Sequence, residues 1–272
     1  MRLKWLIGAA LAAMVVMPAS AAIKQGGGIV VTFKDDMATL DPAIGYDWQN
    51  WSIIKSLYSR LMDYEPGTTN LRPDLAESYE VAPDGLTYTF KLRHGVKFHN
   101  GRELTSDDVI YSMNRTVDPK TQSPGASFYH SIKGYDDVVG GKAATLSGVS
   151  APDAYTVKFE LSGPDATFLH ELALNFASVV AKEDVEKWGA DYGHHPDGSG
   201  AFFMSDWTLG QQIVLERNKD YYWSGIPYLD KITFEIGQEP VVALLRLQKG
   251  EVDVLGDGVP PAKFNEVMGD PA

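Results

Sequence analysis

Segments with the patterns of strands and of helices alternate along this chain, and this mixture limits its possible folds more than any other feature. Residues 155–161 alternate apolar with polar side chains, which predicts a strand with one buried face. Residues 78–81 and 86–92 alternate in the same way, and the Pro-Asp-Gly sequence between them predicts the turn of a β-hairpin. Residues 29–33 form a β-branched run that predicts a further, buried strand.

Helix patterns lie between these strands. Apolar residues spaced by three and four in residues 48–62 predict an amphipathic helix, which Pro66-Gly67 would end. The Thr-Ser-Asp-Asp sequence at 105–108 predicts a capping box that opens a second helix, and residues 164–174 predict a third. The remaining expected elements are strands at 212–216, 231–236 and 252–255 and a helix at 240–248. This order predicts a mixed α/β fold, and the lack of a fixed-period repeat argues against solenoids and propellers.

The composition excludes several functions. The 272 residues include 24 Lys and Arg against 36 Asp and Glu, a formal net charge of -12. A surface of this sign repels phosphates, so we expect no nucleic-acid partner. The absence of cysteine excludes disulfides, thiolate metal sites and cysteine nucleophiles. We expect no cofactor.

The N-terminus has the pattern of a secretory signal. Arg2 and Lys4 precede an uncharged apolar run at 6–17, and Ala19 and Ala21 supply the small residues that a signal peptidase reads. The run is too short to span a bilayer as a helix. We therefore expect residues 1–21 to be a cleaved signal peptide. Because no cysteine is available for a lipid anchor, we expect the mature chain to lie in the periplasm.

The sequence offers little evidence for catalysis. His170-Glu171 could open a zinc-protease motif, but Leu174 stands where that motif needs a second histidine. His194 and His195 are adjacent and would point to opposite faces of a strand, so we expect no metal site there. No residue is assigned a catalytic role. The many carboxylates leave a carboxylate-dependent hydrolase open as an alternative.

Several long motifs follow one another in a characteristic order. They are residues 71–93, 95–101, 104–112, 198–202, 221–232 and 250–254. The chain closely resembles the family 5 extracellular solute-binding proteins, the receptors of peptide and nickel ABC importers. One departure is Ala201, which stands where the family usually has proline in its Gly-Thr-Gly-Pro-Phe block.

The resemblance implies an α/β (mixed α+β) fold, namely the first lobe of a periplasmic binding protein with its inserted subdomain. We expect residues 22–63 and 190–255 to form the core of the lobe and residues 64–189 the inserted subdomain. Residues 256–272 would begin the crossover to a second lobe that this chain lacks. The chain is then either a fragment or a single-lobe derivative, and we favour the fragment because a cleft needs two walls to exclude water from a ligand.

The resemblance also places certain residues near a ligand. They are Phe33, Lys34, Asp35, Asp36 and Met37 after the first strand, Tyr46 and Trp48 at the next helix, and Ser199 and Gly200. A carboxylate at Asp35 or Asp36 would bind a ligand ammonium group, although both fit equally well as solvated surface acids. Trp48 would add an aromatic wall, but packing in the core explains it better.

The function implied by the resemblance is transport without chemistry. We expect the substrate-binding component of an ABC importer, which binds a peptide or similar small solute between two lobes and delivers it to permease subunits in the inner membrane. The protein would be a monomer and not an enzyme. The alternatives are the hydrolase above and a single-lobe protein without a role in transport.

Overall fold

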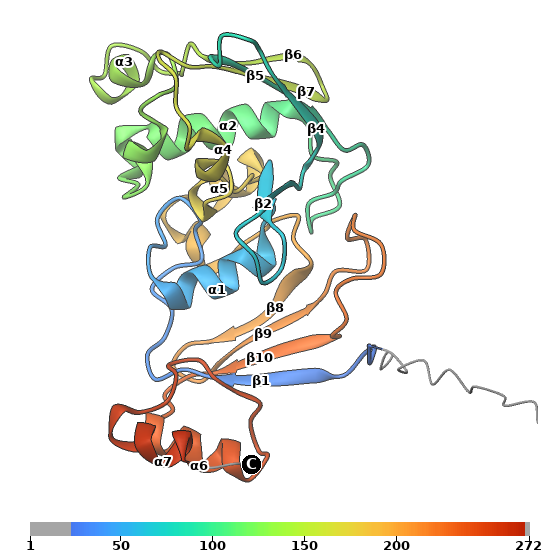
Figure 1. The fold of residues 1–272 in the computed structure, drawn as a ribbon, viewed down its shortest axis with the longest axis vertical. Coiled ribbons are helices and arrows are strands. Elements are labelled where there is room, and N and C mark those ends of the chain that lie inside the picture. The colour runs from blue at the N-terminus through green and yellow to red at the C-terminus, as the bar shows by residue number, and fades with distance from the viewer. Residues whose placement is uncertain (1–22, 270–272) are drawn as a thin grey trace, which may run out of the picture.

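A computed structural model describes residues 23–269 of the chain (Figure 1), so the predicted signal peptide lies outside the described residues. The mixed α/β fold is confirmed. One group of elements surrounds a five-stranded sheet, and a second group surrounds a four-stranded sheet above it in Figure 1.

The five-stranded sheet has the order β11-β1-β10-β9-β8. Strand β1 lies between β11 and β10 and runs parallel to both, whereas β10, β9 and β8 are antiparallel neighbours. Its strands are β1 (Gly28–Thr32), β8 (Phe202–Thr208), β9 (Gln212–Arg217), β10 (Lys231–Glu235) and β11 (Val254–Leu255).

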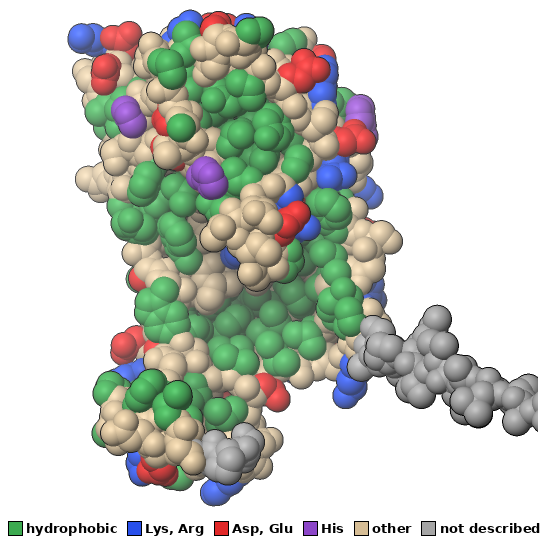
Figure 2. All heavy atoms as spheres, in the orientation of Figure 1, with side chains coloured by type: hydrophobic (Ala, Val, Ile, Leu, Met, Phe, Trp, Pro, Cys, Tyr) green, Lys and Arg blue, Asp and Glu red, His purple; other side chains and the backbone are tan. Residues whose placement is uncertain are grey.

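One face of this sheet packs against helix α1 (Trp48–Leu57). The helix buries Ile53, Ile54 and Leu57 against alternate residues of the strands, including Ile213 and Phe234. Figure 2 shows hydrophobic side chains in the hollow between α1 and the sheet. The partly buried apolar residues packed against this core include Ile29, Met204, Leu229 and Ile232.

The four-stranded sheet has the order β4-β5-β7-β6 and is antiparallel throughout. Helix α2 (Ser106–Val117) packs against it through Val109 and Met113. The strands are β4 (Ala76–Val81), β5 (Thr87–Leu92), β6 (Val149–Asp153) and β7 (Thr156–Glu160), and a separate pair is β2 (Met62–Tyr64) with β3 (Leu71–Pro73).

Short helices complete the fold. They are α3 (Tyr135–Val139), α4 (Phe168–Glu171), α5 (Lys182–Trp188), α6 (Pro240–Gln248) and α7 (Phe264–Met268), with 3-10 turns at Pro119–Thr121, Ala126–Tyr129, Asn175–Ala177, Gly189–His194 and Pro261–Lys263. Helix α6 connects β10 to β11, and both α6 and α7 lie beside the edge strand at the bottom of Figure 1.

The buried apolar residues form two separate clusters. One runs from Leu61 to Ala181, and the other combines residues 31–58 with residues 180–236. These clusters are the basis on which we propose residues 22–63 and 190–255 as one structural unit and residues 64–189 as an insertion into it. Each unit would then bury most of its own apolar surface, with Leu61 and Met62 packed in the upper cluster and Val180 and Val185 in the lower one.

The β-hairpin of β4 and β5, the strand in 155–161 and the capping box are confirmed. Thr105 is the N-cap of α2, and its backbone N–H donates to the Asp108 carboxylate at 2.9 Å. The predicted helix over 48–62 is too long, because α1 ends at Leu57 and Tyr58 is extended. The next backbone groups bond to distant segments instead, since the Ser59 carbonyl accepts from the Val179 N–H and the Arg60 carbonyl from the Leu75 N–H.

The predicted helix over 164–174 is also largely wrong, because only α4 is helical there. The Asp165 carboxylate accepts hydrogen bonds from the backbone N–H (2.8 Å) and hydroxyl (2.6 Å) of Thr167, which hold a turn at the start of the segment. Beyond α4, Leu172 is fully buried in the upper core. Tertiary packing therefore overrides the local helix preference.

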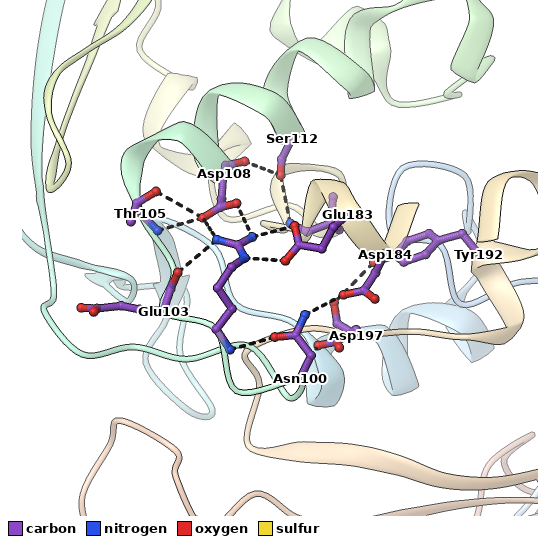
Figure 3. Close-up of polar contacts among 11 residues, drawn as sticks. Asn100, Glu103, Thr105, Asp108, Ser112, Glu183, Asp184, Tyr192 and Asp197 are labelled. Atoms are coloured by element: carbon purple, nitrogen blue, oxygen red, sulfur yellow. Dashed lines mark hydrogen bonds and ion pairs between the residues drawn. The ribbon is translucent and has the colours of Figure 1, made fainter. Parts of the chain in front are cut away.

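A polar joint connects the hairpin at 97–103 and the start of α2 to the segment that leads back to the lower sheet (Figure 3). The Arg102 guanidinium binds the Asp108 carboxylate with two hydrogen bonds, of 2.7 and 3.0 Å, and also binds Glu183. Asn100 donates from its side chain to Asp184 at 2.7 Å and from its backbone to Asp197 at 3.3 Å. The hairpin at 97–103 is thereby fixed to residues 183–197.

Two titratable groups in this joint have displaced pKa values. Burial, with the neighbouring Asp184 charge as a further cause, raises the pKa of Asp197 to about 7. Burial lowers the pKa of His99 to about 4. The neutral His99 accepts the Gly198 N–H at Nδ1 (3.3 Å) and donates from Nε2 to the Gly200 carbonyl (3.2 Å). Both groups are therefore uncharged in the folded chain at mildly acidic pH.

Gly200→Ala should destabilise the fold. A Cβ at residue 200 would lie 2.4 Å from the Ser56 carbonyl oxygen and 2.4 Å from the Leu57 carbonyl carbon, which are backbone atoms that cannot rotate away. We expect a loss of about 2–4 kcal/mol in the free energy of unfolding, measured by chemical denaturation. Gly163→Ala is the matched control, because a Cβ there meets no atom within 4 Å. Equal stabilities of the two variants would contradict this packing.

Asp197→Asn should change how stability depends on pH. The folded chain keeps Asp197 protonated until about pH 7, whereas an unfolded Asp ionises near 4, so the wild type loses stability as the pH rises through this window. Asparagine cannot ionise. Because water still reaches part of the carboxyl group, we expect the variant to gain roughly 1–2 kcal/mol over the wild type between pH 4.5 and pH 8.

The measurement is denaturant unfolding at both pH values, with the exposed Asp220→Asn as the control. A stability difference between Asp197→Asn and wild type that is the same at both pH values would contradict the prediction.

Candidate functional site

The carboxyl ends of three strands meet at one edge of the five-stranded sheet. Because β1 is parallel to both β10 and β11, the loops that follow these strands lie together. In open α/β sheets, ligands bind beyond the carboxyl ends of the strands. This edge lies between the start of α1 and the α6–α7 pair (Figure 1). We call it the strand edge and take it as the candidate site.

Phe33 and Met37 are buried in the core beneath the loop that follows β1. Phe33 is 1% exposed and stacks on Phe234, with ring centroids 5.9 Å apart. Its edge also faces the Trp48 ring at 5.5 Å, and Met37 is 4% exposed. Two of the predicted site residues are therefore core residues that hold the loop in place.

The two predicted carboxylates differ. Asp36 accepts three hydrogen bonds, from the Met37 N–H (2.8 Å), the Trp207 indole (3.2 Å) and the Gly210 N–H (2.6 Å). These contacts fasten the loop after β1 to the turn between β8 and β9. Asp35 is exposed, and its side chain makes no hydrogen bond within residues 23–269. Only Asp35 therefore has a carboxylate that is open to a ligand.

Asp257 is a component of the strand edge that the sequence analysis missed. Its carboxylate accepts from the Lys34 N–H at 2.7 Å and from the Gln49 side chain at 2.8 Å. The preceding Gly256 lies so close to Phe33 that a Cβ would meet the ring at 2.4 Å. The Gly-Asp-Gly sequence directly after β11 was the available signal, since parallel strands bring such turns together.

Lys34 also faces the start of α6. Its ammonium group lies 3.5 Å from the Glu239 carboxylate, and both side chains are at least half exposed. Such an exposed pair contributes little to stability, so a charged ligand can compete for either partner.

Tyr46 and Trp48 are each 56% exposed at the start of α1. The prediction that Trp48 packs in the core is wrong. The buried face of α1 includes Asn50 and Ile53, and Trp48 is rotated about 200° from Asn50 around the helix axis. Asp47 caps the helix by accepting the Asn50 N–H at 2.7 Å. The cap fixes the direction in which both aromatic side chains leave the chain.

Ser199 and Gly200 lie away from the strand edge. They pack beneath the C-terminal end of α1, where the Gly200 N–H donates to the Leu57 carbonyl at 2.9 Å and Ser199 is fully buried. Trp48 is at the other end of the same helix, about 15 Å along its axis. The structure therefore does not bring these two residues together with the loop after β1.

The rim of the strand edge is unusually apolar for an exposed surface. Besides Tyr46 and Trp48, Leu209 at the turn between β8 and β9 is 67% exposed. The neighbouring helices α6 and α7 expose Val241, Val242, Leu245, Phe264 and Met268. Contiguous exposed apolar residues with polar neighbours mark binding surfaces.

The other candidate sites from the sequence are structural. His194 and His195 both bind the Asp191 carboxylate, at 2.9 and 3.1 Å. Within the described residues, no three His, Asp or Glu side chains are grouped to hold a metal ion. Residues 23–269 also contain no helix with the length and hydrophobicity that crossing a membrane requires.

Comparison with known proteins supports the resemblance. Di/tripeptide-binding protein 4 of Pseudomonas aeruginosa (strain UCBPP-PA14) is 34% identical over 213 residues, which cover 74% of this chain and 39% of that protein. The dipeptide-binding protein of Escherichia coli (strain K12) is 37% identical over 213 residues, which cover 73% of this chain and 38% of the relative.

Comparison of the fold with solved structures finds proteins of the same kind. The solved structure of a periplasmic oligopeptide-binding protein from Borrelia burgdorferi matches with a TM-score of 0.83 at 27% identity, over 90% of this chain and 50% of that one. This chain thus spans half or less of each of these three proteins. Residues 70–271 match the family described as "Bacterial extracellular solute-binding proteins, family 5 Middle". The chain therefore belongs to the family 5 bacterial extracellular solute-binding proteins.

Proposed function

We propose that this chain supplies one wall of a periplasmic receptor that binds a small peptide at the strand edge and delivers it to an ABC permease. The observation that carries the proposal is that Tyr46 and Trp48 are exposed at the start of α1, while Asp35 in the loop after β1 has an exposed carboxylate. The relatives named for di- and tripeptide binding support the ligand class. A peptide offers the apolar side chains and the ammonium group that such a surface would bind.

The opposite wall would come from the part of the relatives that this chain does not span. A ligand that contacts both walls stabilises the closed arrangement, because only that arrangement makes both sets of contacts. The receptor would be a monomer, and the permease would recognise the closed form. No bond of the ligand is made or broken in this proposal.

Titration calorimetry on the receptor with both walls tests the proposal directly. This receptor is titrated with a set of di- and tripeptides, with a simple sugar and a nickel–histidine chelate as other solute classes, and the peptide is afterwards analysed by mass spectrometry. We expect saturable binding of peptides and recovery of the intact peptide. Hydrolysed peptide would favour the carboxylate-dependent hydrolase, and tighter binding of another solute class would reject the peptide.

Asp35→Asn should weaken the binding of peptides that carry a free ammonium group. Loss of a charge-assisted contact of this kind costs about 1–3 kcal/mol, so we expect a Kd about 5- to 150-fold higher by calorimetry. N-acetylated peptides should bind the variant and the wild type equally.

Asp36→Asn is the control for this prediction. The Asp36 carboxylate is hydrogen-bonded to Trp207 and Gly210, so Asp36→Asn should lower the melting temperature. Any change in Kd should be the same for peptides with a free ammonium group and for N-acetylated peptides. If Asp35→Asn binds free peptides as tightly as the wild type, Asp35 has no role in the site.

A further inference from the structure

A short loop before α1 presents two apolar side chains to solvent. In residues 41–46, Ile44 is 42% exposed and Tyr46 is 56% exposed, although both are large hydrophobic residues. The loop directly precedes Trp48 and so continues the rim of the strand edge. Exposed apolar side chains on an ordered loop are typical of recognition surfaces.

The loop is held by more contacts than an ordinary connection needs. The Asp41 carbonyl accepts from the N–H groups of Ile44 (3.1 Å) and Gly45 (2.8 Å). The Gly45 carbonyl accepts from the Trp51 indole at 2.8 Å. A Cβ at Gly45 would lie 2.8 Å from the Ile54 Cδ1 atom and 3.3 Å from the Asp41 carbonyl oxygen, so a larger residue would require Ile54 to move. The loop is therefore rigid before any ligand arrives.

Aromatic rings support Tyr46 from beneath. Its ring centroid lies 5.7 Å from that of Trp51 and 5.1 Å from that of Phe176. Trp51 and Phe176 also contact each other edge to face at 5.5 Å. One face of the Tyr46 ring is thus packed, and more than half of the side chain remains open to solvent.

A buried ion pair anchors the base of the loop to the inserted unit. Arg115 of α2 makes two parallel hydrogen bonds to the Asp41 carboxylate, and the Nη1–Oδ1 distance is 2.8 Å. The side chains are 13% and 4% exposed. Burying two charges is costly, and an apolar pair could stabilise the fold equally well, but a bidentate pair also fixes geometry. Arg115 therefore fixes the place from which Ile44 and Tyr46 project.

We propose that Ile44 and Tyr46 form a preformed apolar seat for one aromatic or large aliphatic side chain of the ligand, with Arg115 as its positioning residue. The seat rests on the proposed function and narrows its ligand class to peptides that carry at least one such side chain. Because the loop is ordered in advance, the ligand loses little affinity to ordering it.

Calorimetry with four tripeptides tests the seat: Ala-Ala-Ala and the three tripeptides with a single Phe. The readout is the ratio between the Kd of Ala-Ala-Ala and that of the best Phe peptide. Tyr46→Ser should lower this ratio about 3- to 10-fold, the effect of one aromatic contact. Tyr228→Ser is the matched control, because Tyr228 is also exposed but precedes β10 at the opposite edge of the sheet.

Arg115→Met tests the positioning role. It should lower the same ratio, and Arg115→Lys should restore part of it. Arg102→Met removes another Arg–Asp pair of α2 that does not touch the loop, so it should leave the ratio unchanged even if it lowers the melting temperature.

Each outcome decides between the proposals. A wild type that binds none of the tripeptides refutes the proposed function, and the seat with it. Tripeptide binding with an unchanged ratio in Tyr46→Ser overturns the seat alone. An Arg115→Met variant that loses stability but keeps the wild-type ratio shows that Arg115 is only structural.

Discussion

The parallel pairing of β1 with β10 and β11 is the constraint on which the rest of the structure depends. It joins the first strand to segments near the other end of the chain and brings three loops to one edge. Each loop then contacts another: Lys34 binds Asp257, and the Phe33 carbonyl accepts from the Gln238 N–H at 3.0 Å. Parallel strands require long crossover connections, and here the connection from β1 to β10 contains the whole four-stranded sheet.

Local patterns predicted the elements whose stabilising contacts are local or repeat along the chain. The hairpin of β4 and β5 has its turn sequence between the two strands, and the capping box of α2 lies within four residues. The end of α1 could not be predicted in this way. Ser59 and Arg60 leave the helix because their carbonyls bond to segments distant in the sequence, and no periodicity in residues 48–62 carries that information.

The candidate site shows the same limit. The resemblance indicated the loop after β1 without separating Asp35 from Asp36. Asp36 is engaged because folding brings Trp207 and Gly210 to its carboxylate. The exposure of Trp48 is a different case. Its spacing from Trp51 and Ile54 places Trp48 on the predicted apolar face, whereas the folded chain buries the neighbouring face that includes Asn50.

The opposite pKa shifts of His99 and Asp197 have a consequence for how this joint responds to acid. Acid normally charges a histidine below about pH 6.5, and an aspartic acid normally becomes charged above about pH 4. In this joint His99 becomes charged only below about pH 4, and Asp197 becomes charged only above about pH 7. One group gains stability from rising pH where the other loses it. Between about pH 4 and about pH 7 the charge on these two groups therefore does not change, and the charges of the joint are those of Arg102 and its partners Asp108 and Glu183.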